Sequence, residues 1–180
     1  MNITAVIGMG PDSGKTSFLN YFIPLLKDNN VCLTSLGFNR LFSLSKKNVQ
    51  KPKVFIPKGC LFTSVPAFTF KNISSLSVLK KTGVYTSIGE IFIYQPLENV
   101  RLSLCGPANI KELNDLIFLF NRLGKNNVIV DGAMDRKSSL EIQGINKVIL
   151  AAGAGNGSLD ELLSNVSDFY YLSSLSKKKI

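Results

Sequence analysis

The feature that most constrains this chain is a glycine-rich loop that lies between a short apolar run and a helical pattern. Residues 3–7 read Ile-Thr-Ala-Val-Ile, which predicts a buried strand. The loop at residues 8–17 reads GMGPDSGKTS, and apolar side chains recur at helical spacing after it, beginning with Phe18 and Leu19. Pro24 should end or kink that helix. A strand, a glycine-rich turn and a helix in this order open an α/β fold.

The loop is a variant of the phosphate-loop pattern GxxxxGK[ST], because Met9 stands where the strict pattern has glycine, with Gly8 and Gly10 on either side. In such a loop, backbone N–H groups at the helix N-terminus bind phosphate oxygens. We expect Lys15 to contact the β- and γ-phosphates and the Thr16 hydroxyl to coordinate magnesium. The predicted nucleotide-binding residues are consecutive: Gly10, Pro11, Asp12, Ser13, Gly14, Lys15, Thr16 and Ser17.

Two other interpretations of the loop stay open. Gly8, Gly10 and Gly14 also fit a GxGxxxG dinucleotide pattern, which expects an acidic residue about 20 positions later to bind the ribose. Residues 34–40 read TSLGFNR and contain no acid, which disfavours that pattern. The segment also fits a plain strand-to-helix turn. The strand before the loop and the helix after it favour a nucleoside triphosphate site.

Three aspartates are candidate catalytic residues. Asp131 directly follows the apolar run at 128–130, as a Walker B aspartate does, and is predicted to hold the magnesium ion together with Thr16. Asp12 lies inside the loop, where it can serve the metal or the attacking water, or cap the helix. Asp135 can orient a water or a phosphate. Turn and capping roles remain the alternatives for these residues.

The rest of the chain alternates predicted strands and helices. Residues 31–36 form the second expected strand, and the polar stretch that continues to about residue 52 is expected to be a mobile loop. Between 54 and 104, short apolar runs such as FTF at 68–70 predict a strand-rich middle whose pairing the pattern leaves open. Further buried strands are expected at 128–130 and 148–150.

Two helices and an edge strand complete the expected order. Asn109 and Glu112 form a capping-box-like start for a long amphipathic helix, and Gly124 supplies its left-handed stop. Ser158 caps the last helix, after which residues 169–172 are an expected closing edge strand. The predicted fold is α/β, a P-loop NTPase-like three-layer sandwich with a mostly parallel central sheet and a strand-rich middle insertion.

Length and composition narrow the possible functions. The 180 residues, 45% of them hydrophobic, suit one domain, expected at 1–172, with a basic, disordered tail at 173–180. The absence of histidine excludes Ser-His-Asp and Cys-His nucleophiles and histidine-ligated metals. Three widely spaced cysteines and no membrane-length apolar run indicate a cytoplasmic protein without a zinc site. The net charge of +9 comes from scattered lysines, which favours a solvated basic surface over a nucleic-acid groove.

Several segments together resemble the small nucleotide-binding subunit of the lysine 5,6-aminomutase reactivase family. They are GPDSGKTS at 10–17, LTSLG at 33–37, KPKVFIPKG at 51–59, LCGPA at 104–108, VDGAMDRKS at 130–138 and ILAAGA at 149–154. The resemblance implies a chaperone-like protein whose nucleotide binding or hydrolysis drives release of damaged cobalamin from an adenosylcobalamin-dependent aminomutase, together with a larger partner ATPase subunit. Among nucleotides, ATP with Mg²⁺ is expected over GTP, because the chain has no guanine-reading NKxD segment.

Two alternative functions remain. GPDSGKTS also resembles the phosphate loop of polynucleotide 5′-hydroxyl kinases, and the +9 charge suits an RNA substrate. However, the arginines at 40, 101, 122 and 136 are dispersed, whereas those kinases carry a lid of phosphate-clamping arginines. The other alternative is a non-hydrolysing scaffold subunit in which nucleotide serves only to order residues 37–52.

Overall fold

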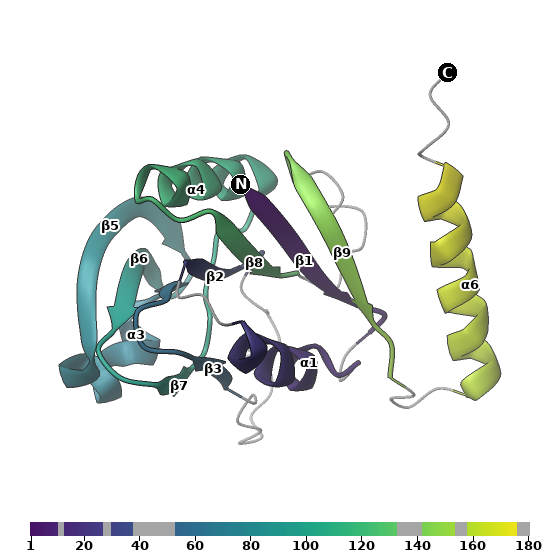
Figure 1. The fold of residues 1–180 in the computed structure, drawn as a ribbon, viewed down its shortest axis with the longest axis horizontal. Coiled ribbons are helices and arrows are strands. Elements are labelled where there is room, and N and C mark those ends of the chain that lie inside the picture. The colour runs from purple at the N-terminus through teal and green to yellow at the C-terminus, as the bar shows by residue number, and fades with distance from the viewer. Residues whose placement is uncertain (11–12, 27–29, 38–52, 133–141, 154–157, 176–180) are drawn as a thin grey trace.

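Within the residues that the structure describes, the chain is built around a seven-stranded sheet (Figure 1). The structure is a computed structural model and describes residues 1–10, 13–26, 30–37, 53–132, 142–153 and 158–175. The strand order is β5-β6-β4-β2-β8-β1-β9. The strands are β1 (Asn2–Gly8), β2 (Val31–Ser35), β4 (Leu61–Ser64), β5 (Leu76–Thr86), β6 (Gly89–Pro96), β8 (Asn127–Asp131) and β9 (Ile145–Ala151).

The sheet is mixed but mostly parallel. Strands β4, β2, β8, β1 and β9 run parallel to one another, and β6 and β5 extend the β4 edge in antiparallel fashion. The α/β class is therefore confirmed. The strand-rich middle is confirmed as well, because it contributes β4, β5 and β6 together with a separate antiparallel pair, β3 (Val54–Ile56) and β7 (Val100–Leu102).

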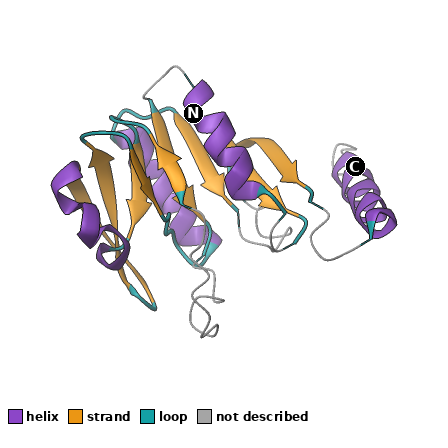
Figure 2. Ribbon diagram, turned by 90° about the horizontal axis from the view of Figure 1, so that it is seen from below, coloured by secondary structure: helices purple, strands orange, loops and turns teal. Residues whose placement is uncertain are grey.

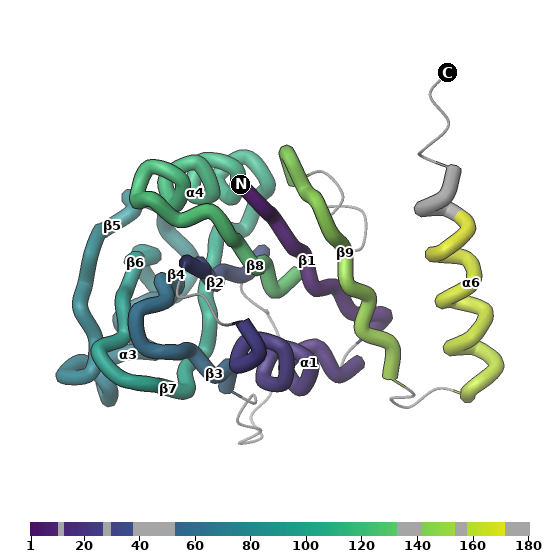
Figure 3. The backbone as a smooth tube through the Cα atoms, viewed as in Figure 1, coloured from purple at the N-terminus to yellow at the C-terminus, as the bar shows by residue number. Residues whose placement is uncertain are grey.

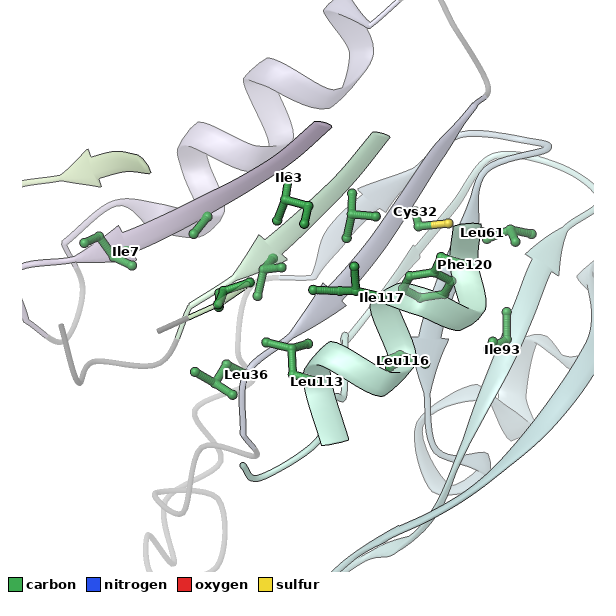
Figure 4. Packing of buried hydrophobic residues seen from close by; sticks show 14 residues of the cluster. Ile3, Ile7, Cys32, Leu36, Leu61, Ile93, Leu113, Leu116, Ile117 and Phe120 are labelled. Atoms are coloured by element: carbon green, nitrogen blue, oxygen red, sulfur yellow. The ribbon is translucent and has the colours of Figure 1, made fainter. Parts of the chain in front are cut away.

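Helices cover both faces of the parallel strands (Figure 2). Helix α4 (Ile110–Arg122) packs on one face, where its buried side chains meet residues of several strands (Figure 4). Helix α1 (Lys15–Phe22) covers the other face together with β3 and β7. Along β1, Ala5 and Ile7 belong to the first of these two cores and Val6 to the second, as expected for a strand that is covered on both faces.

The helix boundaries follow the capping signals of the sequence. The Asn109 side chain accepts a hydrogen bond of 2.9 Å from the backbone N–H of Glu112, and Gly124 after the helix has a φ of 76°. The Ser158 hydroxyl accepts one of 3.2 Å from the N–H of Glu161 at the start of α6 (Leu159–Leu175). The expected N-caps of these two helices and the left-handed residue after α4 are thus confirmed.

Pro24 also acts as expected, because α1 ends at Phe22 and a short 3₁₀ helix, η1 (Ile23–Leu25), follows it. In contrast, the strand expected at FTF is wrong. Residues 66–75 form the short helix α3 (Pro66–Thr69) and the 3₁₀ helix η2 (Phe70–Ser75). Pro66 occupies the first helical position, where its missing N–H and fixed φ suit a helix.

The edge strand expected at 169–172 is also wrong, because these residues continue α6. No glycine or proline stands between Ser158 and Leu175 to stop the helix, and side chains such as Phe169 and Tyr170 simply occupy further helical positions. The expected domain boundary between residues 172 and 173 therefore falls inside α6. This helix comes after β9 in the chain and stands beyond the β9 edge of the sheet (Figure 3). No helix in the described ranges is both long and apolar enough to cross a bilayer.

Candidate functional site

The carboxyl ends of three adjacent parallel strands bring the predicted site residues to one edge of the sheet. Strand β8 lies between β1 and β2, and Asp131 at its end pairs in register with Val6 on one side and Ser35 on the other. Backbone hydrogen bonds hold this edge, from Gly132 N–H to Val6 O at 2.8 Å and from Leu36 N–H to Asp131 O at 3.0 Å. In open α/β sheets, ligands bind in the crevice outside the carboxyl ends of the strands.

The glycine-rich loop leads from this edge into α1. Gly14 is the N-cap of the helix, with φ 89° and ψ 7°, a left-handed conformation that favours glycine. Because glycine has no side chain, no side-chain hydrogen bond caps the helix, and no acidic residue stands in its first turn. The N–H groups of the first turn receive no cap from Gly14, and such N–H groups, together with the positive end of the helix dipole, favour an anion.

Gly8 is the last residue of β1, and side chains of the loop and of the first turn of α1 lie against it. A β-carbon at Gly8 would overlap both the Oγ of Ser13 and the Nζ of Lys15. The Ser13 hydroxyl and the Lys15 ammonium thus converge over the same backbone position, and only glycine leaves them room there. The list of predicted nucleotide-binding residues began at Gly10 and missed this role of Gly8, although a glycine placed directly after an apolar strand was the available signal.

Ser13 is almost fully enclosed, with 4% of its surface exposed. Its Oγ is buried and has no hydrogen-bond partner within the described part of the chain. On the other side, a β-carbon at Gly153 would lie 3.2 Å from the Cα, C and O of Ser13, so the segment after β9 presses closely on the loop. A further backbone hydrogen bond, from Met9 N–H to Ala151 O at 3.0 Å, joins the start of the loop to β9.

A second close contact supports the end of β2. A β-carbon at Gly106 would overlap the backbone carbonyl of Ser35, so the segment that leads to α4 crosses directly over this strand end. The Gly37 N–H donates to Pro107 O at 2.5 Å, and the Cys105 N–H donates to Thr63 O at 3.0 Å. These contacts fix Ser35, and through its pairing with Asp131 they fix the neighbouring strand end.

Both predicted metal ligands lie among the described residues. Thr16 is the second residue of α1 and is half-buried, and Asp131 is half-buried at the end of the strand next to β1. Carboxylate and hydroxyl oxygens suit Mg²⁺, which typically uses one or two carboxylates, waters and substrate phosphates. The described residues hold no group of three or more His, Cys, Asp or Glu side chains that would form an all-protein metal cage. One carboxylate and one hydroxyl oxygen are donors of the type that Mg²⁺ accepts.

The structure describes most of the predicted site residues. Gly10, Ser13, Gly14 and the first turn of α1, with Lys15, Thr16 and Ser17, lie together after β1, and Asp131 lies at the adjacent strand end. Pro11, Asp12 and Asp135 lie outside the described residues, and so does the expected loop at 38–52.

Two of the three cysteines are ill suited to nucleophilic chemistry. Cys32, Cys60 and Cys105 are all buried, and none of them forms a disulfide within the described part of the chain. Burial raises the pKa of the Cys105 thiol to about 11, although its hydrogen bond with Thr86 partly opposes this effect. Burial also raises the pKa of Cys32 strongly. These two thiols therefore stay protonated near neutral pH, whereas a reactive cysteine needs a thiolate.

A comparison of the whole chain with protein-family models, with curated proteins and with solved structures found no match.

Proposed function

We propose that the chain binds a nucleoside triphosphate with Mg²⁺ through the loop between β1 and α1, in the manner of P-loop NTPases. The single observation that carries this proposal is the convergence of Ser13 Oγ and Lys15 Nζ over Gly8, at the N-terminus of α1, where the N-cap Gly14 makes no side-chain hydrogen bond. A cation, a hydroxyl and the N–H groups of a helix N-terminus are the chemistry that a phosphate group requires.

Each residue has a distinct role in this proposal. The N–H groups of the first turn of α1 hold phosphate oxygens, and the Lys15 ammonium neutralises charge on the terminal phosphates. Thr16 and Asp131 hold the magnesium ion, which offsets phosphate charge when it is bound. The strand order supports Asp131 in this role, because β8 is the immediate neighbour of β1 and ends at Asp131 opposite Val6, two residues before the last residue of β1.

The preferred nucleotide is proposed to be ATP. The chain contains no NKxD segment with which many guanine-binding proteins read the base. Asp12 and Asp135 remain proposed as residues that position the water for a weak hydrolysis.

Titration calorimetry of ATP and of GTP with Mg²⁺ tests the phosphate site. Wild type should bind, and Lys15→Ala should bind at least about tenfold more weakly, because a charge-assisted hydrogen bond contributes about 1.5–3 kcal/mol. Lys80→Ala is the matched control, since Lys80 is an exposed lysine on β5. Equal affinity of the folded Lys15→Ala protein would remove the basis of the assignment. Phosphate release from the same samples then measures hydrolysis.

The narrower role rests on the resemblance of short segments to the reactivase subunit. We propose that nucleotide binding here assists reactivation of an adenosylcobalamin-dependent aminomutase together with a larger ATPase subunit. Affinity capture with the tagged chain tests this role, and recovery of an aminomutase is the expected result. Retention on single-stranded RNA without an aminomutase would instead favour the polynucleotide kinase alternative, and binding of neither would favour a lone nucleotide switch.

A further inference from the structure

We infer that the side chain of Ser13, and not only the backbone around it, is a ligand-binding group, and that its hydroxyl donates a hydrogen bond to the same phosphoryl group that Lys15 contacts. This inference rests on the proposed nucleotide site and deepens it. In most positions of a phosphate loop the backbone N–H groups do the binding, and the side chain is free to vary. Ser13 differs because of where its hydroxyl lies.

The first argument is the cost of burying the hydroxyl. Ser13 is 4% exposed, and its Oγ has no hydrogen-bond partner among the described residues. A buried polar atom without a partner destabilises the folded state, so such atoms are rare in folded proteins. An alanine at this position would avoid that cost. A ligand that supplies the missing partner is a physical reason for a serine here.

The second argument is the direction of the hydroxyl. The Ser13 Oγ lies over Gly8 beside the Lys15 Nζ, since a β-carbon at Gly8 would overlap both atoms. It therefore points to the position where the positive charge of Lys15 lies, at the N-terminal end of α1. An ammonium group has donors and no acceptor, so the group that satisfies both side chains must be an acceptor and an anion. A phosphoryl group meets both requirements.

The third argument is that the backbone around Ser13 is held in place. Gly153 lies against the Cα, C and O of Ser13, and Gly14 fixes the left-handed turn that follows. The Ser13 backbone is thus held between the segment after β9 and the start of α1. This limits how far the backbone can shift to bring the hydroxyl to another partner. A group that is held in this way loses little entropy when a ligand binds.

A purely structural role for Ser13 makes the opposite prediction for stability. If the hydroxyl stabilised the empty loop, then Ser13→Ala would lower the melting temperature of the nucleotide-free protein. If the hydroxyl is reserved for a ligand, Ser13→Ala removes an unsatisfied buried group, and the melting temperature should stay the same or rise. Stability without ligand and affinity for ligand should therefore change in opposite directions.

The experiment measures both quantities for wild type, Ser13→Ala, Lys15→Ala, the double variant and the control Ser164→Ala, in which an exposed serine of α6 is changed. Thermal unfolding without nucleotide reports stability, and titration calorimetry with Mg²⁺ and ATP reports affinity. We expect Ser13→Ala to bind ATP about tenfold to a hundredfold more weakly than wild type, from the energy of a hydrogen bond to a charged acceptor. The control should match wild type in both measurements.

The double variant tests whether the two side chains act on one group. Their effects on affinity should be clearly less than multiplicative, because residues that share a partner are energetically coupled. Full multiplicativity, an unchanged affinity of Ser13→Ala, or a lowered melting temperature of its nucleotide-free form would each overturn the inference. If wild type itself fails to bind ATP and GTP, the proposed function fails. If wild type binds and only Lys15→Ala is weakened, this inference alone fails.

Discussion

Gly8 ends β1 at the point where the Ser13 hydroxyl and the Lys15 ammonium meet. The residue is buried, and the space that a side chain would need is already taken by these two groups. The absence of a β-carbon at Gly8 therefore allows the Lys15 ammonium and the Ser13 hydroxyl to lie side by side over this residue. Glycine is required at this position for the space it leaves and not for its backbone conformation, because Gly8 is not one of the described glycines with a positive φ.

Gly8→Ala tests this requirement. The new methyl group should displace the flexible end of Lys15 and the Ser13 hydroxyl, while the strand accepts alanine at little cost. We expect an affinity for Mg²⁺ and ATP at least about tenfold below wild type by titration calorimetry, from the loss of a hydrogen bond to a charged group. Thermal unfolding of wild type and Gly8→Ala without nucleotide separates a loss of folding from a loss of binding. If Gly8→Ala bound nucleotide with wild-type affinity, the proposed role of the close packing of Ser13 and Lys15 over Gly8 would be contradicted.

At the scale of elements, α4 supports the site from the far face of the sheet. Its side chains Leu113, Leu116, Ile117 and Phe120 are buried against the strands, including β1 and β8, whose ends carry the loop and Asp131. The start of α4 follows the segment that crosses the end of β2 at Gly106. The cap at Asn109 therefore anchors the point where this segment becomes helix.

Asn109→Ala should lower the melting temperature by about 2–4 °C, because loss of an N-cap side chain costs about 1 kcal/mol. The affected contact is the 2.9 Å hydrogen bond from the Glu112 N–H to the Asn109 side chain. Differential scanning calorimetry measures the change. Asn121→Ala is the matched control on the exposed side of the same helix, where alanine is the better helix former and no loss is expected. An equal drop in both variants would argue against a capping role.

At the scale of the whole molecule, the site is assembled from segments that are distant in sequence. The loop after β1, the end of β8 and Gly153 after β9 meet at the carboxyl edge of the sheet. These parts are aligned only in the folded chain, so a ligand that bridges them binds the native state and not the unfolded one. Ligand binding should therefore stabilise the whole fold.

A saturating concentration of nucleotide should raise the melting temperature of wild type. At about 100 times the dissociation constant, mass action adds about 2.7 kcal/mol, which corresponds to several degrees for a chain of this size. Scanning fluorimetry with Mg²⁺ and ATP measures the shift, and Lys15→Ala should show little of it at the same concentration. A shift of equal size in Lys15→Ala would indicate that the nucleotide binds elsewhere.

The short-range features of this protein were readable from its sequence. Caps at Asn109 and Ser158, the stop at Gly124, the buried strand around residues 128–130 and the strand at 148–150, which is only half-buried, depend on residues within a few positions of one another. Two strand predictions failed. At FTF the apolar run suggested a strand, but Pro66 starts a short helix there. At 169–172 no glycine or proline ends α6, so the helix continues through these residues. Apolar spacing alone did not separate strand from helix in those two runs.

Only the tertiary structure decided which strands pair and what meets across them. It placed β8 between β1 and β2, so that Asp131 ends beside the loop, and it attached β5 and β6 to the β4 edge. It also brought Gly106 onto Ser35 and Gly153 onto Ser13. Pairing and close approach over such separations depend on how the faces of many elements fit together, whereas periodicity and capping depend on neighbours along the chain. For this reason the sequence alone predicted which residues are candidates for phosphate binding, and only the fold showed that the Ser13 hydroxyl is buried and lies beside Lys15.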